Sequence, residues 1–171
     1  MTVFRLLLII ILLLILPQVS FAQSSYVLPY PSTMPGGLAY KLRLVYDAIS
    51  KYWYFGSFGQ FDYNLKLADK YLVEAKTLFE YRQYLLAHNA LRKSDFYFKK
   101  LMFSLEKASG EGKDVSQKRA TLRNAAQKHI DIIEEIEVPE VFIWQPEKAP
   151  STRLDLKKSS SNSISVRKNN L

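Results

Sequence analysis

Residues 61–79 read FDYNLKLADKYLVEAKTLF, and their spacing decides the fold class. Apolar side chains recur at intervals of four, three, four, three and four residues, the period of one face of an α-helix. These side chains are Phe61, Leu65, Ala68, Leu72, Ala75 and Phe79. Asp62 stands where an N-cap is expected. The pattern predicts an amphipathic helix over residues 62–81 whose apolar face packs in a core.

Three further segments have a helical period. Residues 38–55 carry an apolar face that we expect to face the core, formed by Leu38, Leu42, Val45, Ile49 and Tyr52. Asp114, with Gln117 at capping-box spacing, opens a last helix that ends before Pro139. Short connections make consecutive helices antiparallel. The sequence therefore predicts an all-α fold without strands, an antiparallel bundle of about four helices (38–55, 62–81, 84–108 and 114–137).

The N-terminus has a different composition. Arg5, the apolar run Leu6–Leu16 and the small-x-small site Ser20-Phe21-Ala22 predict an export signal over residues 1–22. The alternative is an uncleaved membrane anchor through residues 3–22. We therefore expect the protein to be exported to a periplasmic, extracellular or cell-surface location.

Two flanking segments are predicted to lie outside the helical domain, residues 38–144. Residues 23–37 contain three prolines and are predicted to be an extended leader, either a spacer or a strand that covers a groove. Residues 145–171 hold six serines, three asparagines and six basic residues. Because so few of their side chains are apolar, this basic tail is predicted to be disordered.

Composition argues against several classes of catalysis. The chain of 171 residues has no cysteine, which excludes disulfides, thiolate metal sites and a cysteine nucleophile. Its two histidines, His88 and His129, lack the Glu-x-x-His spacing of a di-iron bundle. Gly-x-Ser-x-Gly, His-Glu-x-x-His and phosphate-loop motifs are absent from the sequence. We therefore expect no catalytic, cofactor-binding or metal-ligating residues, and no enzymatic activity.

Two groups of side chains are candidates for binding. The aromatic turn contains Trp53, Tyr54, Phe55 and Phe58, which form either a recognition surface for a protein or a cluster packed under the leader. The second group is a basic strip on the predicted third helix, Arg92, Lys93, Lys99 and Lys100. Such a strip is either a solvated helix face or a contact for a polyanion. Acidic residues over 131–140 are a third, weaker candidate, either a solvated face or a low-affinity cation site.

Several stretches carry a resemblance to a known family. They are Leu28-Pro29, Pro35-Gly36, Tyr40–Arg43, Lys66–Ala75 and Tyr84–Leu91. Together they resemble an exported bacterial all-helical domain of unknown function, found in small secreted or membrane-anchored proteins. The resemblance implies export and a helical hairpin, and it carries no catalytic residues. Residues 78–94 are also similar to a single tetratricopeptide-like hairpin, although a solenoid needs about three copies.

These observations favour one function and leave an alternative. The first is an exported, non-enzymatic helical domain that contacts another protein of the cell envelope through the aromatic turn. The alternative is binding of an anionic envelope polymer or lipid surface through the basic strip and the tail. Chromosomal nucleic acid is not an expected partner of an exported protein.

Overall fold

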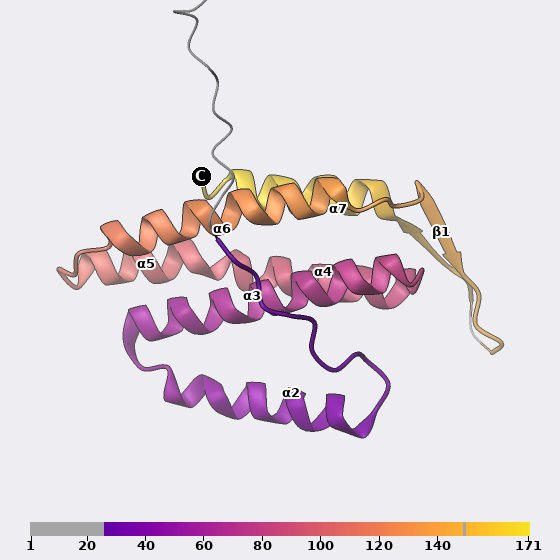
Figure 1. Ribbon diagram of the computed structural model, residues 1–171, viewed down its shortest axis with the longest axis horizontal. Helices are drawn as coiled ribbons and strands as arrows, with labels where there is room; N and C mark the ends of the chain where they lie inside the picture. The colour runs from indigo at the N-terminus through magenta and orange to yellow at the C-terminus, as the bar shows by residue number, and fades with distance from the viewer. Residues whose placement is uncertain (1–25, 149) are drawn as a thin grey trace, which may run out of the picture.

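The computed structural model describes residues 26–148 and 150–171, and most of these are helical (Figure 1). The elements in chain order are α2 (Leu38–Ser50), the 3-10 turn η1 (Lys51–Trp53), α3 (Gly56–Glu80), α4 (Tyr84–Phe98), α5 (Lys100–Gly110), α6 (Ser116–Glu135), β1 (Val141–Trp144), β2 (Thr152–Asp155) and α7 (Leu156–Lys168). The predicted helical class is confirmed. The predicted export signal or anchor lies outside the described residues.

The helices form three layers (Figure 1). The middle layer contains α3, α4 and α5, with α3 antiparallel to the other two because the α3–α4 turn is short. The pair α6 and α7 lies on one side of this layer, and α2 lies alone on the other. None of the helices among residues 26–148 and 150–171 has the length and apolar content to cross a membrane.

The core lies between the middle layer and the α6–α7 layer. The predicted face of α3 is buried along its whole length, from Phe61 to Phe79. At one end of α3, Leu72 and Phe79 pack with Leu91, Ile133 and Leu156. At the other end, the side chains that pack together are Phe61, Leu65, Phe98, Leu101 and Leu122.

The predicted start of the α3 helix is wrong. The helix begins at Gly56 rather than after Asp62, whose carboxylate instead accepts a hydrogen bond from Lys118 Nζ at 2.5 Å. Gly59 allows the earlier start because a Cβ at this position would lie 2.7 Å from the carbonyl carbon of Tyr54. The tight approach lets the chain turn directly from η1 into α3.

The predicted third helix, 84–108, is present as two helices that meet at Lys99. Lys99 keeps right-handed helical angles (φ −57°, ψ −25°), and its N–H donates to the carbonyl of Asp95 at 3.0 Å. The pair α4 and α5 is therefore one rod with a single irregular residue. The last predicted helix begins at Ser116, whose N–H donates to Asp114 Oδ1 at 2.9 Å.

The predictions of a disordered tail and of no strands are wrong. β1 pairs with β2 in an antiparallel hairpin that sets Phe142 opposite Leu154, and both side chains pack against the core. Asp155 then caps α7 by accepting from the N–H of Lys158 at 2.8 Å. α7 buries one face at intervals of four, three and four residues, formed by Leu156, Ser160, Ser163 and Arg167. The helical domain therefore extends past residue 144, and the four predicted helices lack α7.

Candidate functional site

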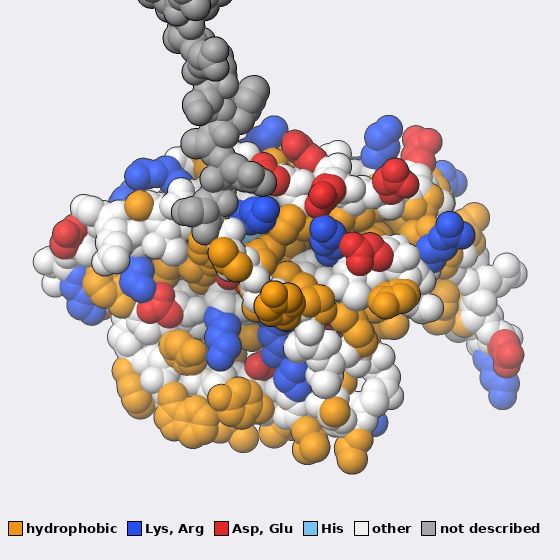
Figure 2. Space-filling view, in the orientation of Figure 1, with side chains coloured by type: hydrophobic (Ala, Val, Ile, Leu, Met, Phe, Trp, Pro, Cys, Tyr) orange, Lys and Arg blue, Asp and Glu red, His pale blue; other side chains and the backbone are white. Residues whose placement is uncertain are grey.

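The outer side of α2 and η1 is an apolar surface turned to solvent. Its large side chains are between 50% and 80% exposed, and we call them the α2–η1 face: Leu38, Leu42, Val45, Tyr46, Ile49, Tyr52, Trp53 and Phe55. In Figure 2 hydrophobic side chains form a band along the edge of the molecule over α2. The prediction that the apolar face of residues 38–55 packs in the core is wrong.

α2 has this orientation because its polar side packs against α3. Arg43 forms an ion pair with Glu74 at 2.6 Å, and Asp47 forms one with Lys70. The Tyr63 hydroxyl donates to the backbone carbonyl of Asp47 at 3.0 Å. Arg43, Asp47 and Glu74 are all largely buried, so turning α2 over would leave these charges without partners.

The aromatic turn divides between this surface and the interior. Trp53 and Phe55 are exposed. Tyr54 is half-buried, with its ring 5.5 Å from that of Tyr63. Phe58 is half-buried beneath the ammonium group of Lys113, which lies 5.4 Å from the ring centroid. Of the four predicted contact residues, the structure therefore places Trp53 and Phe55 on the α2–η1 face.

The leader follows a different course from the one that would cover the aromatic turn. Tyr26 donates its hydroxyl proton to Asp69 Oδ2 at 2.6 Å, in the interior of the domain. Leu28 and Met34 pack against the core cluster around Leu72. Tyr30 is almost fully exposed. The leader residues from Tyr26 onward are thus part of the packed domain, and they leave Trp53 and Phe55 open.

The four residues of the predicted basic strip are all exposed, but they lie on two sides of the α4–α5 rod. Lys93 and Lys100 line clefts that face α2, whereas Lys99 lines a cleft beside α7 with Asp95 and Ser163. Arg92 borders both sides. The expectation that the four share a face is therefore wrong for Lys99.

A cleft of about 750 Å³ lies between α2 and α4, with α3 as its floor. A second cleft of about 370 Å³ shares lining residues with the first and continues toward η1. We call the two together the α2–α4 groove. Its aromatic lining is Tyr40, Tyr63, Tyr71, Phe96 and Tyr97. Tyr71 and Tyr97 stack with their ring centroids 5.8 Å apart.

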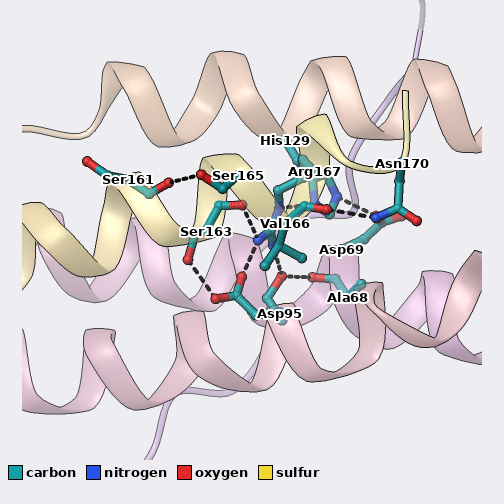
Figure 3. A network of polar contacts seen from close by, with 11 residues as sticks. Ala68, Asp69, Asp95, His129, Ser161, Ser163, Ser165, Val166, Arg167 and Asn170 are labelled. Atoms are coloured by element: carbon teal, nitrogen blue, oxygen red, sulfur yellow. Dashed lines mark hydrogen bonds and ion pairs between the residues drawn. The ribbon is translucent and has the colours of Figure 1, made fainter.

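A third feature is a buried polar network that joins α7 to α3, α4 and α6 (Figure 3). His129 is fully buried in α6, and its Nε2 lies 2.7 Å from Asp69 Oδ1. Arg167 of α7 is also fully buried, and its Nε donates to His129 Nδ1 at 3.4 Å. The guanidinium group also forms an ion pair with Asp95 of α4.

The hydrogen bonds fix the protonation state of His129. Arg167 can only donate, so Nδ1 of His129 must accept, and the ring proton therefore lies on Nε2 and is donated to Asp69. Burial lowers the pKa of His129, and this effect outweighs the hydrogen bond to Asp69, which raises the pKa. Both arguments give a neutral imidazole.

The network is arranged for holding the fold together. Asp69 accepts hydrogen bonds from Tyr26 of the leader and from His129. Asp95 accepts a hydrogen bond from Ser163 of α7 and forms an ion pair with Arg167 of the same helix. Ser94 accepts from Arg167 at 2.7 Å and donates to the carbonyl of Ala68. The network thereby binds the leader, α3, α4, α6 and α7 together.

The predicted acidic segment, 131–140, lies partly on the solvated end of α6 and partly in the chain beyond Glu135, where the helix ends. Glu135 pairs with Lys76 at 2.9 Å, and Asp131 accepts from Gln127. Within residues 26–148 and 150–171, no three carboxylate or histidine side chains are grouped closely enough to hold a metal ion.

Sequence reasoning missed Asp69, Asp95 and Arg167, although the first two carry a signal. Asp69 stands four residues after Leu65 and three before Leu72, and Asp95 has the same spacing between Leu91 and Phe98. A charged residue at such a position on an apolar face is expected to be buried with a partner. Arg167 has no comparable signal, because its face of α7 is formed mostly of serine.

Comparison of the chain with known protein families, curated proteins and solved structures finds no match.

Proposed function

We propose that the protein is an exported, non-enzymatic helical domain that contacts another protein through the α2–η1 face. The observation that carries the proposal is the orientation of α2, which buries its polar side and turns eight large apolar side chains to solvent. Such a contiguous exposed patch is typical of an interaction site. The leucine, valine and isoleucine spacing matches the anchors of a helix that binds in an apolar groove.

The charges beside the α2–η1 face indicate the chemistry of the partner. Lys41 and Lys51 are exposed, whereas the one carboxylate of α2 and η1, Asp47, is buried against Lys70. A partner groove bordered by Asp or Glu would complement these lysines. A second copy of this chain fits less well, since antiparallel pairing centred on Tyr46, near the middle of the α2–η1 segment, sets Lys41 of each copy against Lys51 of the other.

The size and composition of the face suit a protein partner. The face presents eight large side chains that are each at least half exposed, and a standard interface buries about 800 Å² on each partner. Trp53 and Tyr46 both belong to this face, and their ring centroids lie 6.5 Å apart. Tryptophan and tyrosine are the residues that most often dominate binding energy at protein interfaces.

The position of the leader favours a protein over a membrane. Tyr26 binds Asp69 on the side of α3 that faces α6, and α2 lies on the opposite side of the middle layer (Figure 1). Four residues from Ala22 to Tyr26 span at most about 14 Å. A membrane that held residues 3–22 would therefore lie near the α6 side, with the α2–η1 face turned away from it.

Site-specific cross-linking in producing cells tests the proposal. A photo-reactive residue replaces Tyr46, which is 55% exposed, in the full chain, and a control replaces Phe103 on α5, which is 68% exposed. We expect the Tyr46 position to cross-link to one protein, at a groove whose rim carries Asp or Glu. The Phe103 position should leave that protein unlabelled.

Two variants identify the contact. Trp53→Ala should lower the cross-linking yield at least tenfold, because a tryptophan that dominates an interface typically contributes more than 1.4 kcal/mol. Lys41→Glu with Lys51→Glu should lower it through repulsion from an acidic rim. Cross-links to lipid alone, to a second copy, or equally from the Phe103 position would each overturn the proposal.

A further inference from the structure

The α2–α4 groove has an uncompensated positive charge. Its two carboxylates are already satisfied within the domain, Asp47 by Lys70 and Glu74 by Arg43 and the Tyr40 hydroxyl. Arg92 and Lys93 line the same cleft, and neither forms an ion pair with a described residue. Lys93 Nζ lies 5.1 Å from the ring centroid of Tyr71, and its nearest hydrogen-bond acceptor is the Tyr40 hydroxyl, at 3.5 Å.

The positive charge continues toward η1. Lys51 of η1 and Lys100 of the α4–α5 rod both line the second cleft. Burial and the nearby Lys51 charge lower the pKa of Lys100, so these two ammonium groups destabilise each other. An anion between them would relieve this repulsion. Because α4 and α5 form one rod, Lys93 and Lys100 are about 10 Å apart along the groove.

The aromatic side chains of the groove leave few ring faces open. Tyr63 and Tyr71 are buried to more than 90%, and the Tyr71 face is covered by Lys93 and Tyr97. Lys100 lies 3.8 Å from the centroid of Phe96, the ring in the groove that is most exposed. Nucleic-acid bases, which bind single-strand sites by stacking on free aromatic faces, therefore fit this groove poorly.

The neutral polar groups fit a sugar. Tyr71 and Asn89 line the larger cleft, and the Tyr71 hydroxyl has no hydrogen-bond partner among the described residues. Hydroxyl and amide groups spaced along an apolar wall can exchange hydrogen bonds with sugar hydroxyls, while ring edges contact the C–H faces of the sugar. A volume of about 750 Å³ is within the range of ligand sites.

We infer that the α2–α4 groove binds an acidic polysaccharide, with one carboxylate near Lys93 and Arg92 and a second between Lys51 and Lys100. A polyuronate carries a carboxylate on every sugar ring and can therefore place one carboxylate at each of these two positions. The groove lies on the inner edge of α2 and shares Lys51 with the border of the α2–η1 face.

The test measures calorimetric binding of the full chain to a hexamer of galacturonic acid. The comparison ligands are a neutral galactose hexamer, hexaglutamate and a single-stranded DNA oligonucleotide. We expect the uronate hexamer to bind at least tenfold more tightly than each comparison ligand. Affinity should fall as salt rises, because the contacts include ion pairs.

Three variants distinguish specific binding in the α2–α4 groove from nonspecific electrostatic attraction. Lys93→Gln with Lys100→Gln should weaken uronate binding at least tenfold, whereas Lys99→Gln, on the other side of the same rod, should change it less than twofold. Tyr71→Phe removes only a hydroxyl and should weaken binding several-fold with unchanged melting. The inference is overturned if the uronate hexamer fails to bind, if hexaglutamate or DNA binds equally well, or if Lys99→Gln has the same effect as the double variant.

Discussion

α2 and α3 carry apolar side chains at the same helical spacing, but they bury opposite sides. α3 places its apolar face, including Leu72, in the core between the middle layer and α6. α2 leaves the equivalent face, including Leu42, in solvent. The difference shows that a period locates a face on a helix without determining which neighbour, if any, covers that face.

The side of α3 that meets α2 explains the difference. α3 presents Lys70 and Glu74 there, and these charged groups bind Asp47 and Arg43 of α2. An apolar face of α2 placed against them would leave all four charges without partners. The polar contacts therefore set the orientation of α2, and the apolar face remains available for another molecule.

The largest effect is expected in the buried half of this comparison. Leu72→Ala should lower the free energy of unfolding by about 2–5 kcal/mol, because the leucine is fully buried and leaves a cavity. Chemical denaturation of the full chain measures the change. An effect below about 1 kcal/mol would contradict the observed packing of α3.

The polar contact between α2 and α3 should have an intermediate effect. Glu74→Ala removes the partner of Arg43 and should cost about 1–3 kcal/mol, since Arg43 keeps some access to water. Hydrogen exchange should become faster in α2 than in α6. Glu80→Ala, an exposed change on the same helix, is the control and should stay within about 0.5 kcal/mol. Unchanged exchange in α2 would show that other contacts hold the helix.

Acid should destabilise the fold through His129 of α6. The pKa of His129 is lowered in the folded state, so below about pH 6.5 the unfolded chain binds a proton that the folded chain excludes. The contribution of neutral His129 to the free energy of unfolding is therefore fully present above about pH 6.5. The free energy of unfolding then falls as the pH drops from 6.5 toward 5.5, by at most about 1.4 kcal/mol per pH unit.

Substitutions distinguish the contributions of the two histidines to the pH dependence of stability. The pKa of His88 is also lowered by burial, and His88 therefore contributes to the slope in the same direction. We expect His129→Gln to remove more of the slope than His88→Gln does, as measured by thermal melting between pH 7.5 and 5.5. An identical slope in His129→Gln and the unaltered chain would contradict the neutral, buried state of His129.

Helical class could be predicted from the sequence because α3, α4 and α6 bury leucine, isoleucine and aromatic side chains, which define a clear period. α7 could not, since Ser160, Ser163 and Arg167 occupy three of its four buried positions. A polar side chain is buried only where another element supplies its hydrogen bonds, as Asp95 does for Ser163 and Arg167. Those bonds connect residues about 70 positions apart, so local composition predicted disorder instead.

The candidate site shows the same limit. Aromatic clustering in the sequence points to Trp53 and Phe55, but the spacing of Leu42, Val45 and Ile49 resembles that of α3 and therefore predicts a core position for them. Arg43 and Asp47 lie on the opposite side of the same helix, and their partners Glu74 and Lys70 are more than 20 residues away. No local sequence pattern predicts these ion pairs, although the ion pairs determine which side of α2 is exposed.

The smallest effect on stability is expected at Leu42, the counterpart of Leu72. Leu42→Ala should change the free energy of unfolding by no more than about 0.5 kcal/mol, because the side chain is already mostly exposed and leaves no cavity. The same substitution should lower cross-linking at Tyr46, since binding, rather than folding, would bury Leu42. A loss of more than 1 kcal/mol would place Leu42 in a folded-state contact, and the α2–η1 face would then be covered within the chain itself.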